Sequence, residues 1–216
     1  MVPPISDGFA GFDSVYEPRA VDPVLRALDV AIAGTTLVVL LPVLALVSLL
    51  IYLTSGPPVL YRGARVGRGG TVFDMFKFRT LRRGAEHRLD PYYGPELTRR
   101  TEAEVTLVGR ALRATHLDEV PQLINVLRGE MSVVGPRPIR PSFYEELLDR
   151  IPQYWQRLVV RPGVTGFAQT RMGREDAWAA KLVHDLEYIA DRSVTLYLRV
   201  LGATATRILR RTFGGE

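Results

Sequence analysis

The chain has 216 residues, of which 24% are charged, and its 28 basic and 23 acidic side chains give a formal net charge of +5. This length and charge content are those of a globular domain with its own core, which excludes wholesale disorder. The absence of cysteine excludes disulfide frameworks, cysteine-based zinc sites and thiol catalysis, and none of the three histidines has the spacing of a helical zinc motif.

An apolar segment near the N-terminus explains a mean hydropathy of +0.06, which is high for so many charges. No residue from Val30 to Tyr61 carries a formal charge, and such a run is typical of a membrane-inserted helix. Residues 62–113, which follow it, carry 12 basic and 6 acidic side chains, an excess expected on the cytoplasmic side. Pro42 predicts a kink. Two topologies stay open: a kinked helix that spans the bilayer, and one that bends and returns.

The segment after the apolar run has the pattern of a β-hairpin. Two short runs of β-prone residues, 59–62 and 71–80, flank a glycine-rich turn. No Gly-Lys-Ser/Thr follows these glycines, so we interpret them as turn residues rather than as a phosphate-binding loop. Residues 82–100 show no clear hydrophobic period and are predicted to be irregular.

The middle of the chain carries the most informative pattern. Apolar side chains recur there at helical spacing, and Gly129 ends the predicted helix. Because Pro121 fits only in a first turn, the helix is expected to begin close to Asp118 and Glu119. Two carboxylates at this position also have a purely structural explanation, since Thr115 and Asp118 match a capping pattern and the helix dipole favours acids there.

Arginines next to prolines follow this helix. Arg137 lies between two prolines, which restrict the backbone and reduce the entropy lost when the guanidinium binds an anion. Arg161 precedes Pro162 and Gly163, a pair typical of a tight turn. Guanidinium groups suit bidentate recognition of phosphate. Together with carboxylates that hold Mg²⁺, they are the groups needed for phosphoryl transfer.

Residues 173–213 are predicted to be helical, with Asp185 in the first helix. The second helix combines apolar residues with arginines, and it is either an amphipathic helix on a membrane surface or an ordinary packed helix. The net positive charge does not indicate nucleic-acid binding, because the basic residues are not interleaved with aromatic ones in any recognition motif.

At these residues the sequence resembles the bacterial sugar transferases of the small, single-unit type. These are monotopic phosphoglycosyl transferases that start surface-glycan assembly on polyprenyl phosphate. The resemblance extends over about residues 24–210. Its motifs are Leu28-Asp29, GPPVLY at 56–61, RVGRGG at 65–70, FKFRT at 76–80, VGRALR at 108–113, LDEVPQL at 117–123, GEMSVVGPRP at 129–138 and RPGVTG at 161–166. Two positions depart from the family's pattern: Leu41, where serine often precedes the proline, and Glu104, where a basic residue is common.

The resemblance implies an α+β, mostly helical fold with a small β-hairpin and amphipathic helices at the membrane interface. Residues 1–23 would form a loose lead-in. Residues 24–54 would form a re-entrant membrane helix broken at Pro42. Residues 55–216 would form a membrane-associated catalytic domain on the cytoplasmic face of the bacterial inner membrane.

The resemblance also implies a two-step reaction. Asp118 would attack the β-phosphate of a UDP-sugar, UMP would leave, and the aspartyl phosphosugar would be transferred to polyprenyl phosphate. Glu119 and Asp118 would hold Mg²⁺. The residues implied to bind the substrates are Arg113, Arg137, Arg161, Lys77, Arg79 and Asp185.

The expected partners are thus a UDP-sugar, polyprenyl phosphate and membrane lipid, without nucleic acid, while the sugar and the oligomeric state are left open. The alternative from another class of protein is a non-catalytic scaffold that recruits glycan-assembly partners to the membrane. A scaffold gives no reason for Asp118, Glu119 and Arg137 to occur together.

Overall fold

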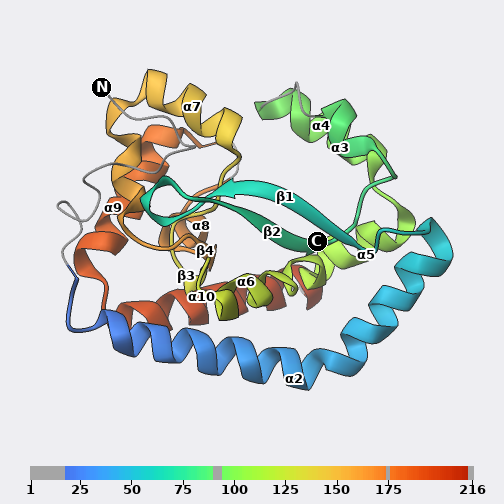
Figure 1. Ribbon diagram of the computed structural model, residues 1–216, viewed down its shortest axis with the longest axis horizontal. Helices are drawn as coiled ribbons and strands as arrows, with labels where there is room; N and C mark the ends of the chain where they lie inside the picture. Colours follow the sequence, from blue (N-terminus) through green and yellow to red (C-terminus); the bar gives the residue numbers. More distant parts are fainter. Residues whose placement is uncertain (1–17, 90–93, 174–175, 214–216) are drawn as a thin grey trace.

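The structure is a computed structural model that describes residues 18–89, 94–173 and 176–213, so most of the predicted lead-in lies outside the described residues. The described part is mostly helical with two small two-stranded sheets, which confirms the α+β class (Figure 1). The helices are α2 (Asp22–Ser55), α3 (Ala85–Leu89), α4 (Gly94–Glu104), α5 (Leu107–Thr115), α6 (Gln122–Arg128), α7 (Pro141–Arg150), α8 (Phe167–Arg171), α9 (Trp178–Asp191) and α10 (Val194–Phe213). The 3₁₀ segments are η2 (Arg68–Gly70), η3 (Leu117–Glu119) and η4 (Pro152–Val159), and the strands are β1 (Leu60–Val66), β2 (Val72–Phe78), β3 (Ser132–Val134) and β4 (Gly163–Thr165).

Helix α2 is bent, and it packs against the rest of the molecule near both of its ends. Its first half buries Asp29 and Ala33, and its second half buries Val47 and Ile51. Pro42 lies between these two contact regions. Figure 1 shows the helix changing direction part-way along its length, as the missing hydrogen bond and the steric clash at an internal proline require.

The rest of α2 leaves its large apolar side chains uncovered. Val38 is 74% exposed and Leu53 is 70% exposed, and the same holds to a lesser degree for Val39, Leu41, Val43, Leu46, Leu49 and Leu50. Within the described residues, α2 is the one helix long and apolar enough to cross a membrane. An apolar surface of this extent is typical of contact with lipid. The protein is therefore membrane-associated, as the sequence predicts.

Strands β1 and β2 form the predicted hairpin. They pair antiparallel in a register that sets Leu60 opposite Phe78 and Val66 opposite Val72. The turn between them contains Gly69, which has a φ of +69° and so adopts a backbone conformation that favours glycine. Strand β1 is longer than its predicted run and β2 is shorter, since the hydrophobic pattern alone does not determine where strand pairing stops.

The second sheet corrects the tight turn predicted at Arg161-Pro162-Gly163. Strands β3 and β4 pair in parallel, with Ser132 opposite Gly163 and Val134 opposite Thr165. Gly163 thus begins a strand instead of ending a turn, and its amide donates to Pro136 O at 2.9 Å. A Pro-Gly pair favours turns locally, but here the pairing with a distant strand determines the conformation.

Helices α3 and α4 correct the prediction that residues 82–100 are irregular. Their sequence lacks an apolar stripe, and α4 is stabilised by ion pairs along its surface. Glu96 accepts hydrogen bonds from Arg99 at 2.7 Å and from Arg100 at 2.5 Å, the i,i+3 and i,i+4 ion pairs that support a polar helix. Glu104 pairs with Arg88 at 2.9 Å and so joins the two helices, which gives this departure from the family pattern a structural role.

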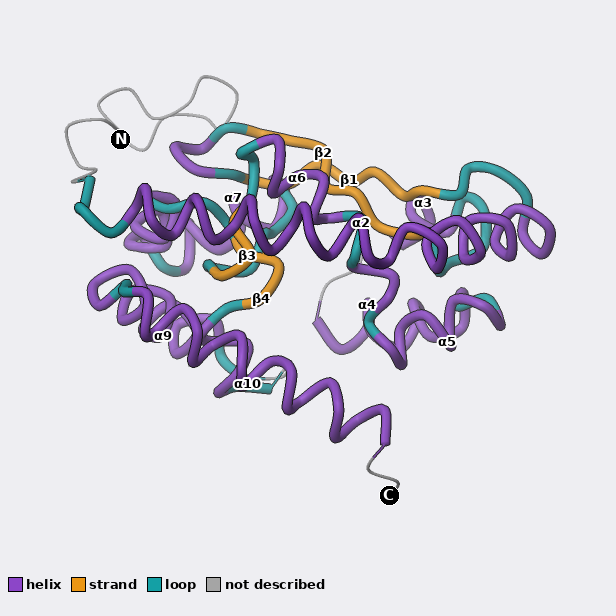
Figure 2. Tube along the Cα trace, turned by 90° about the horizontal axis from the view of Figure 1, so that it is seen from below, coloured by secondary structure: helices purple, strands orange, loops and turns teal. Residues whose placement is uncertain are grey.

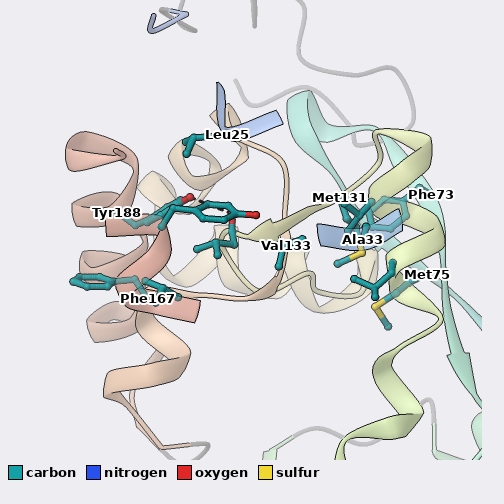
Figure 3. Packing of buried hydrophobic residues seen from close by; sticks show 13 residues of the cluster. Leu25, Ala33, Phe73, Met75, Met131, Val133, Phe167 and Tyr188 are labelled. Atoms are coloured by element: carbon teal, nitrogen blue, oxygen red, sulfur yellow. Dashed lines mark hydrogen bonds between the residues drawn. The ribbon is translucent and has the colours of Figure 1, made fainter. Parts of the chain in front are cut away.

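Buried apolar side chains join these elements around a central core. Figure 3 shows Leu25 and Ala33 of α2 packed on the same cluster as Phe73 of β2 and Met131, which precedes β3. A second cluster joins α7, η4 and α9, and a third joins the end of α2 to Phe78 and α5. The hairpin and α6 are therefore held against the membrane helix.

Helix α10 is a packed helix with one exposed apolar side. Tyr197 and Val200 are buried in the central core, whereas Leu198 and Leu209 are more than half exposed. Figure 2 shows its C-terminal half extending away from the other elements. The packed-helix interpretation thus holds for its first half.

We expect β4 to be sensitive to added volume. A Cβ at Gly163 would lie 2.1 Å from the Gly135 amide nitrogen and 2.3 Å from Thr165 O, and neither atom moves without disturbing the β3–β4 sheet. Gly163→Ala should therefore lower the free energy of unfolding by about 1–3 kcal/mol, measured as a lower Tm in detergent. Gly202→Ala is the control, because a Cβ there meets nothing within 4 Å. An unchanged Tm in Gly163→Ala would contradict this packing argument.

Candidate active site

Asp118 and Glu119 lie in η3, between α5 and α6. His116 makes this turn, with a φ of +56°, and α6 begins only at Gln122, so the predicted helix start is three residues too early. The predicted cap at Thr115 is wrong, because its hydroxyl donates back into α5, to Ala111 O at 3.1 Å. Both carboxylates therefore lie in a separate 3₁₀ turn that precedes α6, and not in the helix itself.

Glu119 is paired with a cation from the hairpin. Lys77 Nζ of β2 donates to Glu119 Oε1 at 2.6 Å, and both side chains are about four-fifths buried. Burial by itself would raise the pKa of Glu119, but the charges of Lys77 and Arg137 outweigh it and hold its pKa at about 2. Glu119 is thus a carboxylate anion over the whole physiological pH range.

Asp118 has the opposite electrostatic character. It is 8% exposed, and burial together with the negative charge of Glu119 raises its pKa, against the influence of Lys77, Arg113 and His116. Arg113 of α5 donates from its Nε to Thr80 Oγ1 at 2.9 Å, which joins its side chain to the segment after β2. Two adjacent carboxylates with pKa values shifted in opposite directions are typical of groups with different chemical roles.

Arg137 reaches this site from a loop with a rigid support. Its side chain is exposed, and its carbonyl accepts a hydrogen bond from Arg157 Nη2 at 2.8 Å. Arg157 pairs in turn with Asp185 at 2.8 Å, and both side chains are at least 94% buried. Asp185 therefore lies behind the loop and acts on Arg137 through Arg157. The sequence did not predict a role for Arg157, because this residue lies outside every recognisable motif.

The other predicted binding residues lie at different places. Arg161 Nε donates to Gly129 O at 2.7 Å, at the opposite end of α6 from Asp118, and this seven-residue helix is about 10 Å long. Arg79 Nη2 donates to the carbonyls of Ser55 and Gly56 at 2.7 and 2.5 Å, where it caps the end of α2. The structure thus gathers Asp118, Glu119, Lys77, Arg113 and Arg137 and separates Arg161 from them.

The acidic residues at the site suit a metal ion only together with a substrate. No cluster of three or more side chains able to ligate a metal occurs among the residues that the structure describes. Mg²⁺ is commonly bound by one or two carboxylates plus substrate phosphates. Asp118 and Glu119 fit that pattern, with a diphosphate supplying the remaining ligands.

Comparison with known proteins identifies the family. A family model described as "Bacterial sugar transferase" matches residues 21–211. The chain belongs to the bacterial sugar transferases. This membership covers nearly the whole described structure, and it confirms the predicted enzyme class, phosphoglycosyl transferase, over a non-catalytic scaffold.

Curated relatives extend this finding. The chain is 39% identical to the UDP-glucose:undecaprenyl-phosphate glucose-1-phosphate transferase of Caulobacter vibrioides, over 89% of this chain and 72% of that protein. It is 38% identical to the exopolysaccharide production protein PSS of Rhizobium leguminosarum bv. phaseoli, over 88% of this chain and 96% of that protein. It is 34% identical to the UDP-N-acetylgalactosamine-undecaprenyl-phosphate N-acetylgalactosaminephosphotransferase of Aeromonas hydrophila. That match covers 85% of this chain but only 43% of the longer relative.

Asp185 provides a test that separates support of the loop from contact with substrate. Asp185→Asn leaves the Arg157 guanidinium buried without its counter-ion, which we expect to cost about 3–5 kcal/mol of stability, seen as a large fall in Tm. Asp191→Asn, an exposed acid in the same helix, is the matched control. If Asp185→Asn kept its Tm and only raised the KM for a substrate, Asp185 would be a substrate contact instead.

Proposed function

We propose that this protein transfers a phosphosugar from a UDP-sugar to polyprenyl phosphate, in the manner of its relatives named as undecaprenyl-phosphate sugar phosphotransferases. The proposed reaction initiates the assembly of a bacterial glycan on its lipid carrier. The observation that carries it is the cluster of Asp118 and Glu119 with Lys77, Arg113 and Arg137, a nucleophile and an anion site within one group of residues.

In the first step Asp118 is the nucleophile. A carboxylate oxygen of Asp118 attacks the β-phosphorus of the donor, the bond from that phosphorus to the bridging oxygen breaks, and UMP leaves with the electron pair. The raised pKa of Asp118 supports this role, because a buried carboxylate with a raised pKa is a stronger nucleophile than an ordinary one. Arg113 and Lys77 stabilise the charge that develops on the phosphoryl oxygens.

In the second step the lipid phosphate takes the place of UMP. One of its oxygens attacks the phosphorus of the aspartyl phosphosugar, the bond to Asp118 breaks, and the carboxylate is regenerated. In the first step, Mg²⁺ held by Glu119 and Asp118 would neutralise charge on the phosphate that leaves with UMP. The low pKa of Glu119 supports this, since an ionised carboxylate is the form that binds a cation.

Arg79 supports an approach of the acceptor phosphate from the end of α2. Its side chain is 4% exposed, and its Nε and Nη1 atoms have no hydrogen-bond partner among the described residues. Buried donors of this kind are costly unless an acceptor reaches them. An anionic oxygen carried on a membrane lipid would satisfy them at the point where the membrane helix joins the catalytic residues.

The attachment of α2 supports the re-entrant topology, and the excess of basic residues in 62–113 favours the cytoplasmic face. Near one end of the helix, Asp22 pairs with Arg192 at 2.7 Å, and at the other end Arg79 bonds the carbonyl of Ser55. A straight helix of 34 residues would be about 51 Å long and would carry its ends to opposite sides of a bilayer about 30 Å thick. Attachment of both ends to one polar body favours a helix that enters and leaves on the same side.

Replacement of Asp118 tests the reaction. With undecaprenyl phosphate, Mg²⁺ and a panel of UDP-sugars, we expect Asp118→Asn to lower UMP release at least about 10³-fold, because the amide cannot form the covalent intermediate. Asp149→Asn, an exposed acid in α7, is the matched control and should keep wild-type activity. In the absence of acceptor, acid-quenched wild type should carry one phosphosugar on the peptide that contains Asp118. Undiminished turnover in Asp118→Asn, or no UMP release by wild type with any donor, would contradict the proposal.

Single cysteines test the topology, since the chain has none of its own. Ala20→Cys and Arg83→Cys place exposed thiols on either side of α2. A re-entrant helix predicts that a membrane-impermeant maleimide labels both in inside-out vesicles and neither in right-side-out vesicles. Labelling of Ala20→Cys from the outside would show a helix that spans the membrane.

A further inference from the structure

Three arginines from different elements lie near one another, and one of them, Arg137, also lies near the proposed catalytic residues. Arg65 comes from β1, Arg137 from the loop after β3, and Arg140 from the position that precedes α7. The loop is docked on the strand, because the amide of Val66 donates to Ile139 O at 3.0 Å. The guanidinium groups are therefore brought together by the fold and not by a flexible surface.

Arg65 is held on the catalytic face of the hairpin. In the antiparallel register, Tyr61 lies opposite Lys77 and Arg65 lies opposite Phe73, so Arg65 and Lys77 share one face. The Tyr61 ring lies along this face, because a Cβ at Gly63 would fall 2.1 Å from its hydroxyl oxygen. That hydroxyl interacts with Arg65, so it orients the guanidinium.

Positive charge is concentrated around Arg65. Burial lowers the pKa of Arg65, and the positive charges of Arg140 and Arg137 lower it further, against the opposing influence of Tyr61. Arg137 also acts on Glu119, whose pKa it lowers. Arg137 thus lies near both Glu119 and Arg65, so it could contact two adjacent phosphates.

The start of α7 adds to this arrangement. The helix has ten residues, no side-chain cap and no acidic residue in its first turn. The partial positive charge at its N-terminus thus acts in the same direction as the arginines next to it. The guanidinium geometry suits an oxygen-rich anion, which it binds by two parallel hydrogen bonds.

We infer that Arg65 and Arg140, with Arg137 shared, form a second phosphate subsite, which binds the α-phosphate of the nucleotide donor and then the nucleoside monophosphate product. The inference rests on the proposed function, in which the β-phosphate meets Asp118. When the bond to the β-phosphorus breaks, the bridging oxygen keeps the electron pair and becomes a terminal oxygen of the monophosphate. The arginines stabilise that added negative charge, and so they assist departure of the leaving group.

Binding of UMP to the detergent-solubilised protein tests the subsite. We expect Arg140→Gln and Arg65→Gln each to raise the Kd of UMP about tenfold or more, because each removes charge-assisted hydrogen bonds to phosphate. Arg150→Gln, at the exposed end of the same helix, is the matched control and should leave the Kd within twofold. The donor KM should rise with the Kd, while the KM for undecaprenyl phosphate stays unchanged. Uridine, which lacks the phosphate, should not compete with UMP.

A measurement on the wild type keeps the test valid where a variant folds poorly. Phenylglyoxal should modify Arg65 and Arg140 less in the presence of UMP, and Arg150 equally with and without it, as mapped by mass spectrometry. Equal modification of Arg65 and Arg140 in both conditions overturns the inference, as does a rise in the lipid KM alone. Because UMP binding requires no turnover, these outcomes are distinct from a failure of the wild type to release UMP, which would overturn the proposed function.

Discussion

The attachment of helix α2 to one polar body at both ends is the constraint on which the rest of the structure depends. Asp29 accepts hydrogen bonds from the Val133 amide at 2.8 Å and from the Tyr197 hydroxyl at 2.9 Å, which join α2 to β3 and α10. Arg79 holds the other end. An apolar helix fixed in this way would meet lipid only along its uncovered stretch, which would keep the residues around Asp118 beside the membrane surface.

Strand β2 connects the membrane helix to Glu119. Arg79 follows the strand and binds the end of α2, and Lys77, two residues earlier, binds Glu119. Side chains two residues apart in an extended chain share a face, which links the position of the helix end to that of the catalytic carboxylate. A shift of α2 would therefore be transmitted to Glu119 through a single rigid element.

The sequence predicted the parts whose cause is local. The apolar run, the hairpin and the Asp118–Glu119 pair each follow from a short pattern, and the structure contains all of them. It did not predict α4, whose stability comes from surface ion pairs, or strand β4, whose pairing partner is some thirty residues away. The position of Arg161, apart from Asp118, was not predicted for the same reason. Its proximity to Arg137 in sequence motifs says nothing about which end of α6 it reaches.

The register of the hairpin separates Arg79 from Arg65, the residues proposed to meet the lipid phosphate and the nucleotide phosphate. Arg79 follows Phe78, which pairs with Leu60 at the open end joined to the membrane helix, whereas Arg65 pairs with Phe73 next to the turn. Five residues of extended strand separate Leu60 from Arg65, a distance of about 17 Å. A lipid phosphate held near Arg79 and a nucleotide phosphate held near Arg65 would thus come to the site from opposite ends of the hairpin. In a two-step in-line transfer, UMP leaves from the face of the phosphorus opposite Asp118 and the lipid oxygen then enters at that same face, so the monophosphate would depart toward Arg65 before the lipid phosphate arrives from the side of Arg79.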